Sequence, residues 1–160
     1  MQRLGFSQWA DILEVATGIV VIVTLIFVGI EIRQNTAAIK MQAHSTALDK
    51  LDGRSYLLAT DPDLHRIVKL AETKRNEMTE EEWSRFTYLE LPHLALWEFI
   101  HDAHSKGNID EGQWQGFDRY FLSFYCSSSS PMRSVYHENL EIWSDPFASY
   151  VATLDTAKCN

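Results

Sequence analysis

The sequence lacks the features that mark most enzymes and nucleic-acid-binding proteins. It contains no G-x-G-x-x-G, G-x-x-x-x-G-K-[ST], H-E-x-x-H or G-x-S-x-G motif. It has no basic run, and its 14 lysines and arginines are outnumbered by 22 acidic residues, which gives a formal charge of -8. Because nucleic-acid binding depends on cations that neutralise phosphates, we expect no nucleic-acid partner. No motif indicates a reaction or a cofactor.

Cysteine and regular strand patterns are also scarce. Cys126 and Cys159 are far apart in the sequence, and neither belongs to a C-x-x-C pair. This spacing does not indicate a disulfide framework. We therefore expect Cys126, beside the aromatic Tyr125, to be a buried thiol and Cys159 to lie free in the tail. No stretch alternates apolar and polar residues between hairpin turns, which argues against strands.

One long apolar run stands out. Residues 15–30, VATGIVVIVTLIFVGI, are uncharged, and Glu14 and Glu31 border them. As a helix with a rise of about 1.5 Å per residue, this run spans roughly 24 Å, whereas the hydrocarbon core of a bilayer is about 30 Å thick. Length alone therefore leaves two alternatives, a transmembrane helix and the buried central helix of a soluble bundle.

The flanks of this run favour a transmembrane helix. Apolar residues extend it at both ends, Trp9 suits one interface, and Arg33 can reach the other. The run is apolar on every face, whereas a helix at the edge of a soluble core has one apolar stripe. We assign these residues to the span and its interfaces: Trp9, Glu14, Val15, Gly18, Thr24, Gly29, Ile30, Glu31 and Arg33.

A cleaved signal peptide is the remaining alternative for the run. Its apolar region would have about 7 to 15 residues and a small-residue cleavage site, whereas this run continues into EIRQNTAAIKMQ. We therefore expect an uncleaved anchor. Arg3 precedes the span, and four basic residues follow it, which predicts a cytoplasmic C-terminal domain. Reduced cysteines would suit that side. The four are Arg33, Lys40, Lys50 and Arg54.

The rest of the chain predicts an all-α domain. We expect a membrane anchor over residues 1–34 and a helical domain over 35–160. The anchor helix should continue to Leu58, and Pro92 should kink the helix that contains it. N-terminal caps predict the other helices; these caps are Asp61 before Pro62, Thr79 with Glu82, Asp110, Ser130 before Pro131, and Asp145 before Pro146.

Several segments resemble a known family. They are LIFVGIEIRQNTAAIK, TDPDLHRI, LWEF, GNIDEGQW and WSDPFASYV. Together they are similar to a widespread family of bacterial proteins that have one membrane helix, a small helical domain and no established activity. The resemblance implies the topology and a bacterial inner membrane, but it supplies no catalytic residue. His101 and His104 depart from the pattern of that family.

Two Glu-x-x-His pairs give the sharpest chemical hypothesis. Glu90 with His93, and Glu98 with His101, place a carboxylate and an imidazole on one helical face, as in helical di-iron proteins. Both pairs lie on one helix, about 12 Å apart, so they cannot close a dinuclear site within one chain. We therefore name them as metal candidates only, and expect them to be structural or interfacial polar residues.

Two classes of function remain. The first is a membrane-anchored interaction or scaffold protein, either a homo-oligomer or an accessory subunit of a larger membrane complex. The alternative is a membrane-tethered metal-binding protein or enzyme that uses the Glu/His face. The first class explains the single span, because one helix forms no transport path.

Overall fold

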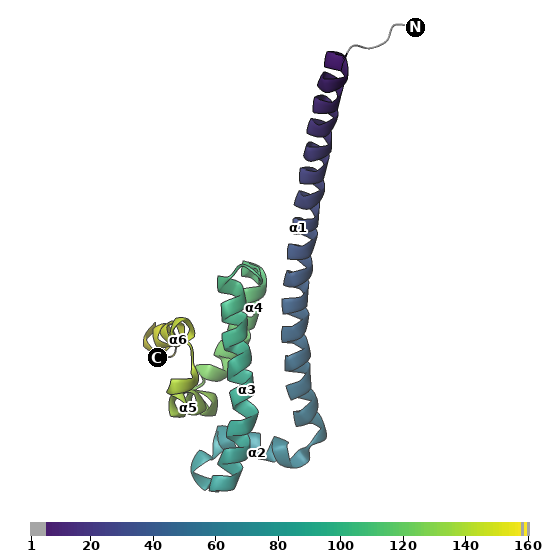
Figure 1. The fold of residues 1–160 in the computed structure, drawn as a ribbon. Coiled ribbons are helices and arrows are strands. Elements are labelled where there is room, and N and C mark those ends of the chain that lie inside the picture. The colour runs from purple at the N-terminus through teal and green to yellow at the C-terminus, as the bar shows by residue number, and fades with distance from the viewer. Residues whose placement is uncertain (1–5, 158, 160) are drawn as a thin grey trace. The chain divides into compact units, whose positions relative to one another are not determined.

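The computed structural model describes residues 6–157 and Cys159, although not the side chains of residues 6–8, 10–12 and 157. Arg3, which contributed to the predicted orientation, lies outside the described residues. The helices are α1 (Phe6–Thr60), α2 (Pro62–Thr73), α3 (Glu80–Ser105), α4 (Glu111–Tyr125), α5 (Pro131–Glu138) and α6 (Asp145–Ala157), with 3-10 turns at Arg75–Glu77 and Leu140–Ile142 (Figure 1). The described residues include no strand, so the all-α prediction is confirmed.

The chain consists of two units, Met1–Met41 and Gln42–Asn160. The boundary falls inside α1, a few residues beyond the anchor end that the sequence predicted at residue 34. The predicted continuation of the anchor helix is confirmed, because α1 runs unbroken to Thr60.

The first unit is an apolar helix. From Leu13 onward α1 is long and apolar enough to cross a membrane, and no part of its most apolar stretch is buried by other residues of the chain. The hydroxyls of Thr17 and Thr24 donate to the carbonyls of Leu13 and Val20. These polar groups are thus satisfied within the helix, as a hydrocarbon environment requires.

Four of the five predicted caps begin helices of the second unit, whereas the cap predicted at Asp145 is wrong, because Asp145 is itself the first residue of α6 and Ser144 precedes it. The Asp61 carboxylate accepts hydrogen bonds from the first turn of α2, and Thr79 forms a reciprocal capping box with Glu82 at α3. Asp110 caps α4 in the same way with Gln113, and a further cap, Ser130, precedes α5. These caps satisfy backbone donors that have no partner inside the helix.

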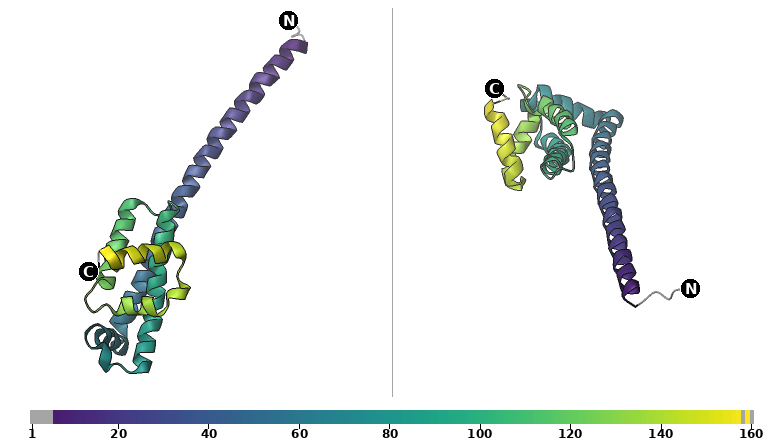
Figure 2. Two further views of the ribbon diagram at one scale, coloured as in Figure 1. Left: turned by 90° about the vertical axis from the view of Figure 1, so that its left-hand side faces the viewer. Right: turned by 90° about the horizontal axis from the view of Figure 1, so that it is seen from above.

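Helix α3 is the centre of the second unit, since it contacts α2, α4, α5 and α6. Helix α4 returns along α3, whereas α5 and α6 cross it (Figure 2). The core is rich in aromatic side chains. Trp97 is fully buried and stacks on Phe121, with ring centroids 5.4 Å apart, and the edges of Phe147 and Tyr150 also face it. Pro92 lies within α3, which continues past it to Ser105.

A disulfide joins Cys126, directly after α4, to Cys159, after α6. The sequence-based expectation of two unpaired thiols is therefore wrong. The two cysteines are 33 positions apart, but α6 folds back over α3 and brings their Cα atoms to 4.6 Å. Cysteine spacing gave no sign of this pairing, because the approach depends on the packing of α5 and α6.

Candidate functional site

The most unusual polar group of the second unit is a buried charge cluster on α1 and α3. Arg54 pairs with one carboxylate oxygen of Glu90, and Nδ1 of His93 lies 3.1 Å from the other. The exposed fractions are 15% for the side chain of Arg54, 3% for that of Glu90 and 2% for that of His93. An ionised carboxylate only accepts hydrogen bonds, so Nδ1 of His93 carries the donated proton.

The surroundings of Glu90 keep it ionised. Burial by itself would raise the pKa of this carboxyl, because a charge is poorly solvated inside a protein. The hydrogen bond from His93 and the charge of Arg54 outweigh burial, so the pKa of Glu90 lies below its ordinary value. Removing either partner would leave a buried carboxylate without compensation, which is costly.

Two nitrogen atoms of this cluster have no partner in the described part of the chain. Nε of Arg54 and Nε2 of His93 are buried and have no hydrogen-bond partner among the described residues. The His93 ring lies between the aromatic rings of α4, with its centroid 4.9 Å from that of Phe121 and 5.8 Å from that of Tyr120. The ring is therefore held in place by packing as well as by Glu90.

Arg54 also lines two cavities. One, of about 260 Å³, reaches Glu90 and the Ser127–Met132 region. The other, of about 280 Å³, lies between α1 and α3, and we call it the α1–α3 cavity. The residues that line the α1–α3 cavity are Lys50, Arg54, Leu57, Tyr88, Leu89, Pro92, His93 and Leu96. This lining includes two cations, Lys50 and Arg54, and no carboxylate.

The second predicted pair, Glu98 and His101, does not form a carboxylate–imidazole contact. Oε1 of Glu98 accepts a hydrogen bond of 2.8 Å from the backbone N–H of Ser144, at the start of α6. His101 instead stacks on Tyr150, with ring centroids 4.9 Å apart. Burial, then the charge of His104, lowers the pKa of His101. Glu98 and His101 thus serve the packing of α6.

The two predicted pairs therefore have different partners, and the structure does not unite them. His104 has partners outside these two pairs: its Nε2 lies 3.0 Å from Oε2 of Glu111, and its ring stacks on Trp114. Within the described ranges, no group of three or more histidine, cysteine, aspartate or glutamate side chains is arranged to hold a metal ion.

Two partly buried tyrosine–carboxylate pairs stabilise the packing of α4 against α6. The Tyr150 hydroxyl donates to Asp118, and the Tyr125 hydroxyl donates to Asp155 at 3.2 Å. Burial and the neighbouring carboxylates raise the pKa of both tyrosines. Both hydroxyls therefore stay protonated and remain donors at neutral pH.

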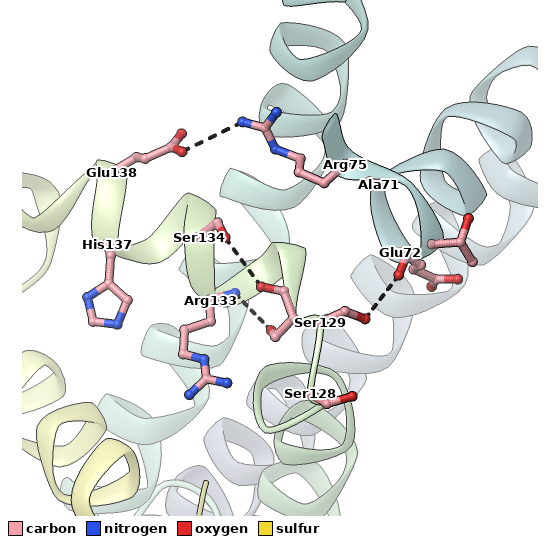
Figure 3. Close-up of a pocket in the computed structure, with 11 residues that line it drawn as sticks. Ala71, Glu72, Arg75, Ser128, Ser129, Arg133, Ser134, His137 and Glu138 are labelled. Atoms are coloured by element: carbon pink, nitrogen blue, oxygen red, sulfur yellow. Dashed lines mark hydrogen bonds and ion pairs between the residues drawn. The ribbon is translucent and has the colours of Figure 1, made fainter. Parts of the chain in front are cut away.

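A third cavity of the second unit, of about 680 Å³, is polar and lies between α2 and α5 (Figure 3). Its cations face carboxylates: Arg75 lies 3.9 Å from Glu138, and Arg133 lies 4.0 Å from Asp155. Ser129 donates to the carbonyl of Glu72 on the opposite wall. Because its charges are balanced, this cavity provides little attraction for an ion.

The residues assigned to the span lie on α1, and those that border it at Glu14, Glu31 and Arg33 are exposed. Trp9 is 54% exposed, Val15 64% and Ile30 49%. Gly18 and Gly29 have no other atom of the chain near the position of a Cβ. The chain itself thus leaves the whole surface of this segment available to lipid or to another protein.

No protein-family model, no curated protein and no solved structure matches this chain. The site must therefore be interpreted from its own geometry. Sequence reasoning found Glu90 and His93, because their spacing places them on one helical face. It missed Arg54 as their partner, because this residue lies 36 positions before Glu90 and only the packing of α1 on α3 joins them.

Proposed function

We propose that the protein is a single-span interaction protein of a bacterial inner membrane, in which α1 anchors the helical domain. In this proposal the domain holds partners at the membrane, either as a homo-oligomer or as an accessory subunit of a larger membrane complex. The observation that carries the proposal is the exposure of residues 13–32. Soluble monomers rarely leave a contiguous apolar surface of this size in water.

This apolar surface must be shielded from water by lipid or by another protein. Each exposed apolar square ångström costs about 25 cal/mol in water, and the apolar side chains of the segment point in all directions around α1. The large ones that are more than half exposed include Val20, Ile22, Leu25, Ile26 and Phe27. Lipid tails cover a helix on all sides, whereas a single docking partner would cover one face.

An interaction role fits the second unit better than a reaction does. The buried Glu90 is already paired with Arg54, and Glu98 and His101 are engaged by α6. These contacts support the structural interpretation of the Glu/His residues over the metal-binding or enzymatic alternative.

We further propose that the helical domain faces the oxidising side of the membrane. The Cys126–Cys159 bond supports this orientation, because disulfides are rare in reducing compartments. It replaces the cytoplasmic orientation that the basic residues favoured. That bias rests on Arg3 before the span against four basic residues after it, of which only Arg33 and Lys40 lie close to its end.

Purification in a mild detergent tests the interaction proposal. We expect a particle whose protein mass is a multiple of the 18.4 kDa chain, or one that contains further polypeptides. A protein mass of one chain would contradict the proposal. A protein that stays in solution without any amphiphile would contradict the membrane anchor.

A double variant at two glycines tests whether α1 contacts the neighbouring molecule in the assembly. Gly18 and Gly29 lie on one face of the helix, and a Cβ atom added at either position has no atom within 4 Å beyond its own helical turn. The double variant Gly18→Leu with Gly29→Leu should therefore weaken association only by blocking the close approach of a neighbouring molecule. Val20→Leu, on the opposite face of the helix, is the matched control, and it should leave the mass unchanged.

Thiol labelling of intact cells tests the orientation. We expect a cysteine introduced at Thr60, on the exposed surface of the domain, to react with a membrane-impermeant maleimide before lysis. Protection until lysis would place the domain in the cytoplasm and would contradict the proposal. The Cys126→Ser and Cys159→Ser background keeps the native thiols out of the measurement.

A further inference from the structure

The α1–α3 cavity differs in its charge pattern from the two other cavities described above. The 260 Å³ cavity contains Arg54 together with Glu72 and Glu90, and the 680 Å³ cavity contains both arginines and glutamates. The α1–α3 cavity is lined by Lys50, Arg54 and His93 and by no carboxylate. This is unexpected in a chain of formal charge -8.

Lys50 is the cation of this cavity that remains available. The other described lysines of the second unit, Lys69, Lys74 and Lys106, each pair with a carboxylate within 3.0 Å. Lys50 has no hydrogen bond or ion pair to any described residue, and it lies one helical turn from Arg54. Glu90 already compensates the charge of Arg54, so Lys50 is the cation of this cavity without a counter-ion among the described residues, and an anion beside it would be stabilising.

The rest of the lining is apolar. Leu57, Leu89, Leu96, Pro92 and the ring of Tyr88 form it, and Leu57 and Tyr88 remain 49% and 73% exposed. A site with a cationic end and an apolar wall matches a ligand with an anionic head and an apolar tail. The volume of about 280 Å³ is at the lower end for ligand pockets, which selects a short tail.

We propose that the α1–α3 cavity binds a medium-chain fatty carboxylate. The carboxylate pairs with Lys50, and Arg54, which stays on Glu90, also lines this end of the cavity. The hydrocarbon chain lies along Leu57, Leu89 and Leu96. This site depends on the second unit alone, so it does not require the interaction role proposed above.

Photolabelling tests the site in the full-length protein, reconstituted in lipid nanodiscs. The probe is decanoate with a diazirine at the end of its chain, and mass spectrometry of the digest locates the label. We expect label on peptides that contain Leu57, Leu89 or Leu96. Excess decanoate should suppress it, whereas methyl decanoate, which has the same tail and no charge, should not.

Three variants make the test specific. Lys50→Gln should reduce labelling of these peptides about tenfold, because it removes a charge-assisted contact. Leu57→Trp should reduce it by filling the cavity, and it should leave folding intact because Leu57 is half exposed. Lys69→Gln removes a cation elsewhere in the same unit and should change nothing.

Three results would overturn the proposal. Label confined to residues 13–32 would mean that the probe only partitions into the bilayer. Equal suppression by methyl decanoate would mean that the cavity does not recognise the carboxylate. Labelling that is unchanged in Lys50→Gln would mean that the unpaired lysine does not hold the head group.

Discussion

The two units of this chain treat apolar side chains in opposite ways. In the first unit Ile22 and Phe27 are both 59% exposed, whereas in the second unit Ile67 and Phe121 are fully buried. The residue types are the same, so the difference lies in what surrounds them. In the second unit, helices α2 to α6 bury the apolar side chains. The apolar side chains of the first unit can be removed from water only by molecules outside the chain.

The largest expected effect comes from charging the first unit. Ile22→Arg combined with Leu25→Arg places two charges near the middle of the apolar run, at a cost of about 5 to 7 kcal/mol for insertion. We expect the variant to be released from membranes by alkaline carbonate. Leu140→Arg, at an exposed leucine of the second unit, should stay in the membrane pellet. If the doubly charged variant stays there as well, the first unit is not held by lipid.

The next effect compares two tryptophans. Trp97→Ala removes a fully buried ring and should lower the free energy of unfolding of the domain by about 4 to 5 kcal/mol. Trp9→Ala, at a residue of the first unit that is 54% exposed, should change it by less than about 0.5 kcal/mol. Pulse proteolysis in urea measures both. Equal losses would mean that Trp9 packs on the domain.

The buried charge cluster should show a pH-dependent effect. Arg54→Met leaves Glu90 buried without its cation and should cost about 3 to 4 kcal/mol at pH 7. Because the pKa of Glu90 is lowered in the folded state, its contribution is complete above the unfolded value of about 4.3 and is lost as the pH falls toward the folded pKa.

The difference in stability between wild type and Arg54→Met should therefore shrink as the pH falls below about 5. The control is Arg66→Met, which removes an arginine whose side chain is 53% exposed and paired with Asp63 and Glu82. It should cost less than about 1 kcal/mol, because water screens such pairs. A pH-independent difference for Arg54→Met would contradict the ionised state of Glu90.

The disulfide gives the smallest of these effects. Cys126→Ser with Cys159→Ser should lower the free energy of unfolding by about 2 to 4 kcal/mol, because the unfolded chain regains the freedom of a loop of 33 positions. A reductant should destabilise the wild type by a similar amount and leave the double variant unchanged. Full alkylation of the unfolded wild type without reductant would show that the bond is absent.

Local features of the fold were predictable from the sequence, and long-range contacts were not. The caps at Asp61 and Thr79 were found because each acts within three residues of its own position. The apolar run was found because its composition is continuous along the chain. The expected kink at Pro92 stays a prediction, because the bounds of α3 do not show whether its axis bends at this residue.

The candidate site shows where such predictions end. Glu90 with His93 was recognised from helical spacing, but Glu98 with His101 has the same spacing and no mutual contact. Tertiary packing decides between the two pairs: Arg54 approaches the first, and the start of α6 takes the carboxylate of the second. The unpaired Lys50 and the disulfide likewise depend on which helices meet.

The ring cluster around Trp97 has a practical consequence for spectroscopy. Helix α1 contributes 55 residues of helix. In detergent we expect its apolar part to stay helical after the domain has unfolded. The far-ultraviolet circular dichroism signal will therefore understate the unfolding of the domain. The fixed contacts of Trp97 with Phe121, Tyr125 and Phe147 give the domain its own near-ultraviolet signal. Loosening of the packing is therefore visible as the disappearance of that band while the helical signal largely persists.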